Sequence, residues 1–219
     1  MPDFGDVKAG LQMPLEEAMT TQRAIRRLRP DPVDDETVLA CLRLATHAPT
    51  GGNLQGWEFV VVRDPDVKHQ LARLNRQSWS VFRRIYGFRL RSEEDRRAVA
   101  ATQWQADHFE EVPVVVVACL RGPRLGFPPF LVNSYYGSIF PAVQNLLLAA
   151  RALGLGATLT TLPVWSTDLA RRTLGLPWSV TPIAAIPLGW PRGRYGPTTR
   201  RPVEENTHLD RFGNRPFAP

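Results

Sequence analysis

Residues 48–63, APTGGNLQGWEFVVVR, turn a predicted helix into a loop and then into a strand within sixteen positions. The glycines of the loop permit positive φ and leave backbone N–H groups uncovered, so a flat ligand could lie directly on them. The FVVV run at 59–62 is typical of a buried strand. The stretch therefore predicts a support for a planar heteroaromatic ring, although a Gly-rich turn without a ligand explains it equally well. The glycines and the amide side chains beside them are Gly51, Gly52, Asn53 and Gln55.

The composition predicts one globular domain over residues 1–219, because 43% of the residues are apolar and 22% are charged. The longest apolar run, Val112–Leu120, has the length of a strand and is too short to cross a bilayer. The N-terminus lacks the basic and apolar regions of a secretion signal. Cys41 and Cys119 form no CxxC pair, which argues against a disulfide framework or a zinc site. We therefore expect a cytoplasmic protein without a membrane partner.

The net charge of +6 comes from arginine far more than from lysine. Nucleic-acid binding is the weakest explanation, since no basic stripe with interleaved aromatic residues and no helix-turn-helix pattern accompanies the charge. Four arginines fall within residues 23–29, where Ile25 and Leu28 interrupt the charges and should pin the backbone, and a second pair is Arg200 and Arg201. Guanidinium clusters of this kind favour a small anion such as a phosphate, whereas a solvated basic turn is the simpler alternative.

The rest of the chain alternates predicted helices and strands without an internal repeat or a domain linker. The stretch 79–110 is weakly patterned and should form one or two helices that cover an apolar surface. The Pro/Arg-rich tail 191–219 is too polar to fold on itself, so it is either disordered or lies on another surface such as a sister chain. We expect helices at 14–21, 36–47, 67–75, 135–153 and 167–174, and strands at 59–62, 112–120, 157–162 and 180–188.

Common catalytic motifs are missing from the sequence. The four histidines are scattered, so no metal site is predicted, and there is no G-x-S-x-G elbow, no Walker loop and no convincing carboxylate pair. Gly154-Leu-Gly156 resembles half of a dinucleotide fingerprint, but it follows a helix instead of a strand. A pocket formed by the two arginine clusters and the Gly loop would lack its own reactive groups. In such a site a cofactor generally carries the chemistry.

Four segments of the chain carry a resemblance to a known family: TQRAIRRLRPDPV (21–33), APTGGNLQGWEFVVVRDP (48–65), ARALGLGATLTTLP (150–163) and IPLGWPRGRYGPTTRRPVEE (186–205). Together they resemble the FMN-dependent nitroreductase family, in family order across most of the chain, whereas residues 75–110 match poorly. The resemblance implies an α+β fold with three layers, α/β/α, in which helices flank a central mixed, mainly antiparallel sheet. It also implies an intertwined homodimer with two FMN molecules at the interface and the arm 191–219 wrapped over the partner.

The same resemblance assigns cofactor-binding roles to individual residues. Arg23 would face the FMN phosphate, and Arg200 or Arg201 would complete the phosphate site. Arg26 would face the pyrimidine edge of the ring. Gln22 and Ala24 stand where the family usually has Arg and Ser, which removes one phosphate charge and one hydroxyl. Backbone N–H groups near flavin N5 and O4 would come from Thr161 and Leu162, and Thr160 beside them is also assigned to the cofactor site. A loop from the other subunit would contribute Pro49, Thr50, Gly51, Asn53 and Gln55.

The implied activity is a ping-pong transfer of electrons from NAD(P)H through flavin N5 to an electron-poor acceptor such as a nitroaromatic or a quinone. The flavin would carry the chemistry, and Arg26 and Thr161 would assist it. The alternative is a non-catalytic FMN-binding or storage protein, in which residues 79–110 or 121–130 would close over the ring. A specialised member that consumes flavin or removes a halide is a third possibility, to which no residue points.

Overall fold

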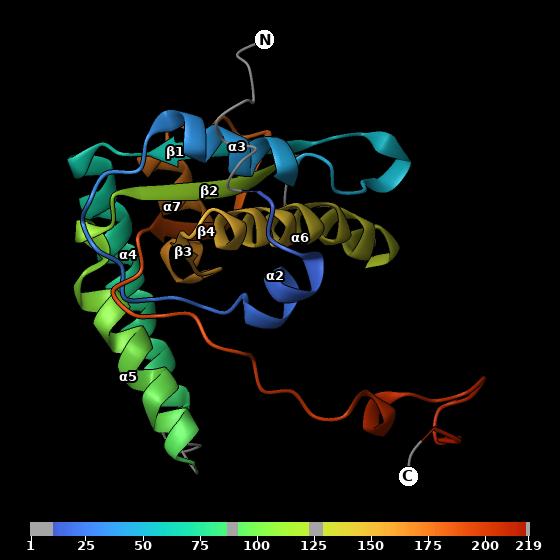
Figure 1. Cartoon of the computed structure of the whole chain (residues 1–219). Coiled ribbons are helices and arrows are strands. Elements are labelled where there is room, and N and C mark those ends of the chain that lie inside the picture. Colours follow the sequence, from blue (N-terminus) through green and yellow to red (C-terminus); the bar gives the residue numbers. More distant parts are fainter. Residues whose placement is uncertain (1–10, 87–91, 123–128, 218–219) are drawn as a thin grey trace.

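The computed structural model describes residues 11–86, 92–122 and 129–217 of the chain (Figure 1). Most of the loop expected at 121–130 lies outside these ranges. The α-helices are α2 (Leu15–Thr21), α3 (Asp35–Ala45), α4 (Pro65–Tyr86), α5 (Glu93–Asp107), α6 (Pro129–Ala152) and α7 (Thr167–Thr173). The strands are β1 (Trp57–Val62), β2 (Val114–Arg121), β3 (Gly156–Ala157) and β4 (Val180–Gly189). The short 3-10 helices are η1 (Gly51–Asn53), η3 (Phe109–Glu111), η4 (Leu162–Val164) and η5 (Val203–Asn206).

The four described strands form one sheet in the order β1-β2-β4-β3, and every neighbouring pair is antiparallel. In the register of β1 with β2, Trp57 lies opposite Leu120 and Val62 opposite Val115. The expected sheet was mixed and mainly antiparallel. Within the described residues it is antiparallel throughout, and β1 is an edge strand.

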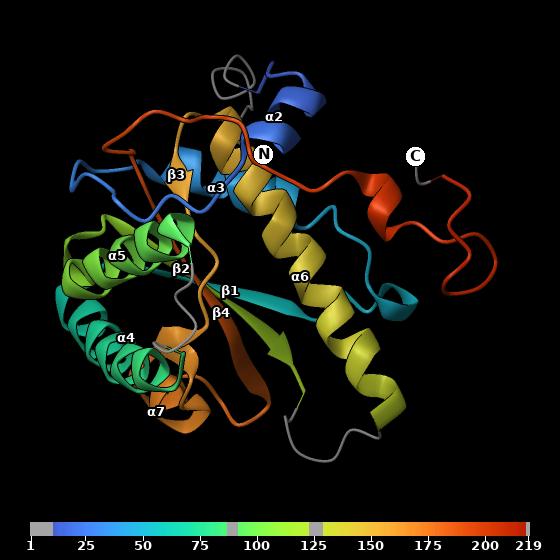
Figure 2. The ribbon, with the colours of Figure 1, turned by 90° about the horizontal axis from the view of Figure 1, so that it is seen from below.

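Strand β2 separates two apolar cores, because its side chains alternate between the faces of the sheet. Val114 and Val116 point into a core shared with α3 and α6, whereas Val115 and Val117 point into a second core that includes Leu71 of α4. Burial on both faces explains why this strand reads as a continuous apolar run. Figures 1 and 2 show helices on both sides of the sheet, which confirms the three-layer α+β architecture.

Several boundaries differ from the sequence-based expectations. Helix α4 begins at Pro65, where Asp64 Oδ1 accepts from the N–H of Val67 at 3.0 Å, and it continues to Tyr86 instead of ending near residue 75. Helix α6 begins at Pro129, so Ser134, the expected N-cap, lies inside the helix. Proline suits a first helical position because its missing N–H would have no intrahelical partner there.

The expected strand 157–162 is also shorter, since β3 ends at Ala157 and only the bridge between Thr160 and Ala185 extends the pairing. The arginine-rich segment 23–29 packs along this edge of the sheet. The N–H of Ile25 donates to Ala157 O at 3.0 Å, and a Cβ on Gly156 would stand only 2.7 Å from Ile25 Cγ2. Glycine at 156 therefore allows the segment to approach closely.

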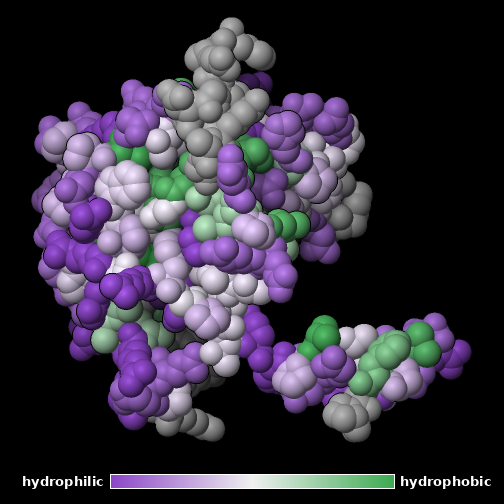
Figure 3. Space-filling view, in the orientation of Figure 1, coloured by the Kyte–Doolittle hydropathy of each residue, from purple (hydrophilic) through white to green (hydrophobic). Residues whose placement is uncertain are grey.

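The C-terminal tail first follows the N-terminal segment and then leaves the body. The N–H of Thr198 donates to Thr20 O at 2.9 Å, and beyond this point the hydrogen bonds of residues 199–217 stay within the tail. Figure 3 shows the end of the tail standing clear of the body, with apolar side chains on its surface. Phe212 is 92% exposed. Among the described residues, no helix is long and apolar enough to span a membrane.

Candidate active site

The segment 23–29 presents arginines from a pinned backbone, as predicted. Leu28 is buried and Ile25 is partly buried against the core formed by β2 and α4, whereas Arg23 is exposed and Arg26 is half-buried. Burial lowers the pKa of the Arg26 guanidinium, and within the described residues no carboxylate pairs with it. A partly desolvated cation without a counter-charge is suited to an anionic or strongly polar ligand atom.

The chain from Thr158 to Leu162 forms a second surface directly beside this segment. Thr158 Oγ1 donates to Ile25 O at 2.8 Å, and Thr160 exchanges two backbone hydrogen bonds with Ala185 at 2.9 and 2.8 Å. Thr158 and Thr160 are buried, whereas Leu159 is 37% exposed and Thr161 is also exposed. Leu159 and Thr161 therefore share an outward face.

Two details of this surface were not foreseen. Leu159 was missed, because the alternation in ATLTTL places Leu159 and Thr161 on one face but does not show that this face is the exposed one. The Leu162 N–H, expected to face the cofactor, donates to Thr160 Oγ1 at 3.3 Å. The Thr161 N–H has no acceptor among the described residues. Of the two, Thr161 is therefore the donor that is available to a ligand.

The Gly loop adopts the positive φ that its sequence predicts, and it does so at three residues: Gly52 (57°), Asn53 (54°) and Gln55 (48°). Its polar groups hold one another, because Gln55 Nε2 donates to Asn53 Oδ1 at 3.1 Å and the Gln55 N–H donates to Thr50 Oγ1 at 3.2 Å. Left-handed geometry at two non-glycine residues is uncommon, and strain of this type is often found at ligand sites.

Helix α6 holds the Gly loop in place through residues that sequence reasoning missed. The Gly51 N–H donates to Ser138 Oγ at 3.2 Å, and a Cβ on Gly51 would stand 2.5 Å from Ser134 Oγ. Near the other end of the same helix, Arg151 Nε donates to Thr21 Oγ1 at 2.8 Å, just before the arginine segment.

The structure does not bring the Gly loop and the arginine segment of one chain together. Ser138 and Arg151 stand thirteen positions apart on α6, which corresponds to about 20 Å at 1.5 Å per residue. Figure 2 shows α2 near the C-terminal end of α6, whereas Gly51 of the loop contacts Ser138 in the N-terminal half of that helix. A site that uses both groups therefore needs a second chain.

The tail arginines are also not placed beside Arg23 in one chain. The tail runs antiparallel to the N-terminal segment, since the Arg192 N–H donates to Arg27 O and the Thr198 N–H donates to Thr20 O, at 2.9 Å each. This path puts Arg23 opposite residues between 192 and 198. Arg200 and Arg201 come later, and their guanidinium groups donate to Thr199 O and Asn206 Oδ1 within the tail.

A pocket of about 390 Å³, which we call the aromatic pocket, opens beside Thr161 and Leu162. Its walls come from α4, α6, η4 and the start of β4, and none of its described lining residues is charged. The lining residues are Ser78, Phe82, Tyr136, Phe140, Thr161, Leu162, Val164, Trp165, Thr167, Thr181, Pro182 and Ile183.

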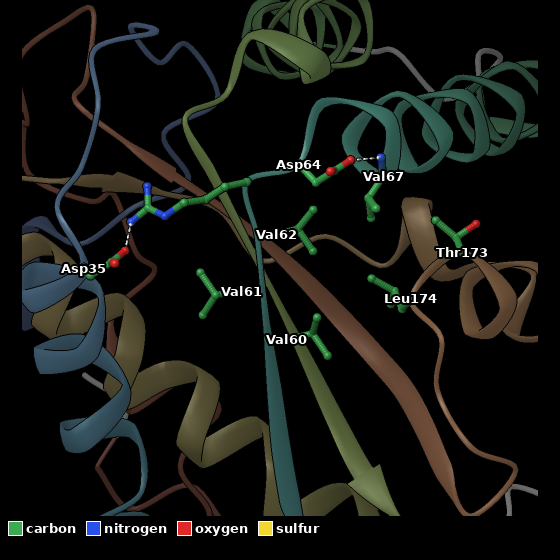
Figure 4. Close-up of a pocket in the computed structure, with 9 residues that line it drawn as sticks. Asp35, Val60, Val61, Val62, Asp64, Val67, Thr173 and Leu174 are labelled. Carbon is green, nitrogen blue, oxygen red and sulfur yellow. Dashed lines mark hydrogen bonds and ion pairs between the residues drawn. The ribbon is translucent and has the colours of Figure 1, made fainter.

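A second hollow, of about 450 Å³, lies along the edge strand β1 (Figure 4). The valines of β1 at 60–62 and Leu174 form its apolar part. At its rim, Arg63 Nη2 lies 2.8 Å from Asp35 Oδ1. The hollow contains none of the predicted site residues. Among the described residues, no cluster of His, Cys, Asp and Glu could hold a metal ion.

Comparisons with known proteins agree with this fold. The sequence model of the Nitroreductase family matches residues 19–190. The chain is similar to iodotyrosine deiodinase 1 of Rattus norvegicus, with 27% identity over 193 residues, 84% of this chain but only 65% of the rat protein. It is similar to 5,6-dimethylbenzimidazole synthase of Rhodospirillum rubrum, with 28% identity over 207 residues, 92% of this chain and 90% of that protein.

A similar solved structure is that of a protein from Desulfovibrio desulfuricans, assigned as a nitroreductase and determined in complex with FMN. The TM-score is 0.67 and the sequence identity 26%, and the match covers 92% of this chain and 99% of that one. The family match spans most of the chain, and the layers and the sheet agree with it. The chain therefore belongs to the nitroreductase family.

Proposed function

We propose that the protein is an FMN-dependent oxidoreductase that passes electrons from NAD(P)H to an electron-poor acceptor, a quinone or a nitroaromatic compound. The observation that carries the proposal is the half-buried Arg26, which lacks a carboxylate partner among the described residues and lies on the segment beside the outward face of Leu159 and Thr161. A cation beside an apolar face fits a flat ring with an electron-rich edge. The FMN complex of the Desulfovibrio relative supports the choice of cofactor.

The residues of the chain would bind and orient the cofactor. Arg26 would hold negative charge at the pyrimidine edge, where a water-poor setting strengthens its effect. The Thr161 N–H would face the N5–O4 side of the ring, and Leu159 would support the ring plane. Arg23, with Arg200 or Arg201, would hold the phosphate through forked hydrogen bonds. Gln22 and Ala24 would add no charge, so the arginines would supply all of the positive charge that faces the phosphate.

Bound FMN would supply hydride transfer at its N5 atom. With a quinone as acceptor, NAD(P)H, one proton and the quinone give NAD(P)⁺ and the hydroquinone, so two electrons and two protons reach the acceptor. Because the described residues of the site include no carboxylic acid and no histidine, the added proton would come from solvent.

The complete site requires a homodimer under this proposal. The Gly loop with Pro49, Thr50, Gly51, Asn53 and Gln55 would serve the partner's cofactor, because about 20 Å of α6 separates it from the arginines of its own chain. Phe212 in the tail exposes 92% of its surface, and a partner would cover it. Residues 1–219 would form one domain, and the arm 191–219, which follows its own chain as far as Thr198, would lie on the partner beyond that point.

The purified protein tests the proposal directly. We expect a yellow dimer by absorption and light scattering, and anaerobic NADH or NADPH should bleach its visible bands. A yellow protein that keeps full colour with both nucleotides would instead favour an FMN-storage role. A colourless monomer would refute the flavoprotein assignment itself.

The similarity to the rat deiodinase favours reductive deiodination as a second candidate activity. Release of iodide from 3-iodo-L-tyrosine by the reduced protein would establish it.

A further inference from the structure

We propose that the aromatic pocket is the acceptor site and that it selects flat, uncharged aromatic molecules, with Trp165 as its specificity-determining wall. This inference rests on the proposed function, because it places the acceptor beside the cofactor face of Thr161. It goes further by naming the class of acceptor and the residues that recognise it.

The position of the pocket supports an acceptor site. Thr161 and Leu162 belong both to the proposed cofactor surface and to the lining of the pocket. Trp165 follows three residues later, at the end of η4, and is 52% exposed. A ligand in the pocket would therefore lie next to the ring that Thr161 faces.

The walls of the pocket are aromatic on three sides. Phe82 comes from α4, Tyr136 and Phe140 come from α6, and Trp165 directly follows η4. The rings of Tyr136 and Phe140 stack with centroids 6.2 Å apart and an interplanar angle of 25°. Faces of this kind bind flat rings by offset or edge contacts. The volume of about 390 Å³ lies in the range of small-molecule sites.

The polar groups of the pocket are neutral hydroxyls. The hydroxyls of Ser78, Tyr136 and Thr161 can donate to a carbonyl or nitro oxygen but cannot neutralise a full charge, whereas the Thr181 hydroxyl already donates to Gly122 O at 3.2 Å. An ionised substituent would lose its hydration without gaining a counter-charge.

Arg171, which contacts Thr181 in the lining of the pocket, already has partners for its guanidinium group. Arg171 donates to Val180 O at 3.2 Å and to Thr181 Oγ1 at 3.4 Å, and it pairs with Asp168 at 3.2 Å. Its guanidinium also lies 4.6 Å from the centre of the Trp178 ring. Arg171 therefore braces the wall, and an acidic ligand would have to break these contacts to use it.

The test compares acceptors that share one ring system but differ in charge. The reduced wild-type enzyme should use 1,4-naphthoquinone with a kcat/KM at least about tenfold above that for 1,4-naphthoquinone-2-sulfonate, and it should release no iodide from 3-iodo-L-tyrosine. Equal use of the sulfonate, or iodide release, would overturn the inference.

A variant series tests the role of Trp165. Trp165→Ala should raise the KM for 1,4-naphthoquinone by about tenfold while the FMN content stays that of the wild type, because one aromatic contact is lost. Trp165→Phe should recover most of this loss. Leu169→Ala, which removes a similarly exposed apolar side chain outside the pocket, is the control and should match the wild type.

An unchanged KM in Trp165→Ala, or an equal rise in the control, would refute the role of Trp165. These failures are distinct from failure of the proposed function, which would appear earlier, as wild-type protein that is colourless or is not bleached by NAD(P)H.

Discussion

Replacing Gly156 by alanine should displace the arginine segment 23–29 from the sheet edge and thereby weaken cofactor binding. The added Cβ would stand 2.7 Å from both Ile25 Cγ2 and Leu28 Cδ2, whereas carbon atoms in contact lie about 3.5–4.0 Å apart. The segment must therefore retreat by roughly 1 Å. Such a shift would stretch the 3.0 Å bond from the Ile25 N–H to Ala157 O beyond hydrogen-bond range.

The expected cost is about 2 kcal/mol, since overpacking a well-filled site typically costs about 1–3 kcal/mol. In a chain of this size that corresponds to a fall in Tm of about 4–8 °C. FMN should also bind more weakly, because Arg23 and Arg26 move with the segment. Thermal unfolding of the apoprotein and titration with FMN measure the two effects separately.

Gly193→Ala is the matched control, because a Cβ at that position would meet no atom within 4 Å. It should melt within about 1 °C of the wild type, as surface substitutions usually do. If Gly156→Ala also melts there and binds FMN normally, then close packing at Gly156 does not position the arginine segment.

Three other substitutions or treatments test separate parts of the site. Arg23→Ala should lose FMN on gel filtration, and unchanged occupancy would move the phosphate site elsewhere. Arg26→Ala should retain FMN but be reduced by NAD(P)H at least about tenfold more slowly; an unaltered rate in stopped flow would contradict its electrostatic role. Burial raises the pKa of Cys41 and Cys119 to about 12, so neither thiol should react with a disulfide reagent at pH 8 until the protein unfolds. Because unfolded thiols ionise near pH 8.5, the unfolded state binds fewer protons above that pH, and stability should fall as pH rises towards 12; a flat stability curve over this range would argue against the burial of these thiols.

The sequence was most informative where burial determines residue type. The run at 112–120 could be identified as a strand because β2 is covered on both faces, so each of its side chains has to be apolar. The order of the strands and their registers could not be read in this way, since they depend on pairing between distant segments. The length of α4 was missed because its second half is amphipathic around exposed arginines, which weakens the apolar pattern.

The residues of the candidate site could likewise be predicted only where a local sequence pattern marked them. The glycines at 51 and 52 and the arginines at 23 and 26 were visible as local patterns. The hydroxyl of Ser138 that holds Gly51 was not, because this contact joins residues 87 positions apart. Leu159 was overlooked because an exposed leucine stands out only once its neighbours at 158 and 160 are known to be buried.

The spacing of the two half-sites along α6 has a genetic consequence. Under the proposed assembly each cofactor draws its arginines from one polypeptide and its glycine turn from the other. Two inactive alleles, one altered in the arginines and one in the turn, would then complement each other when co-expressed. The mixed dimer would carry both lesions in a single cofactor site and leave the other site wholly wild type.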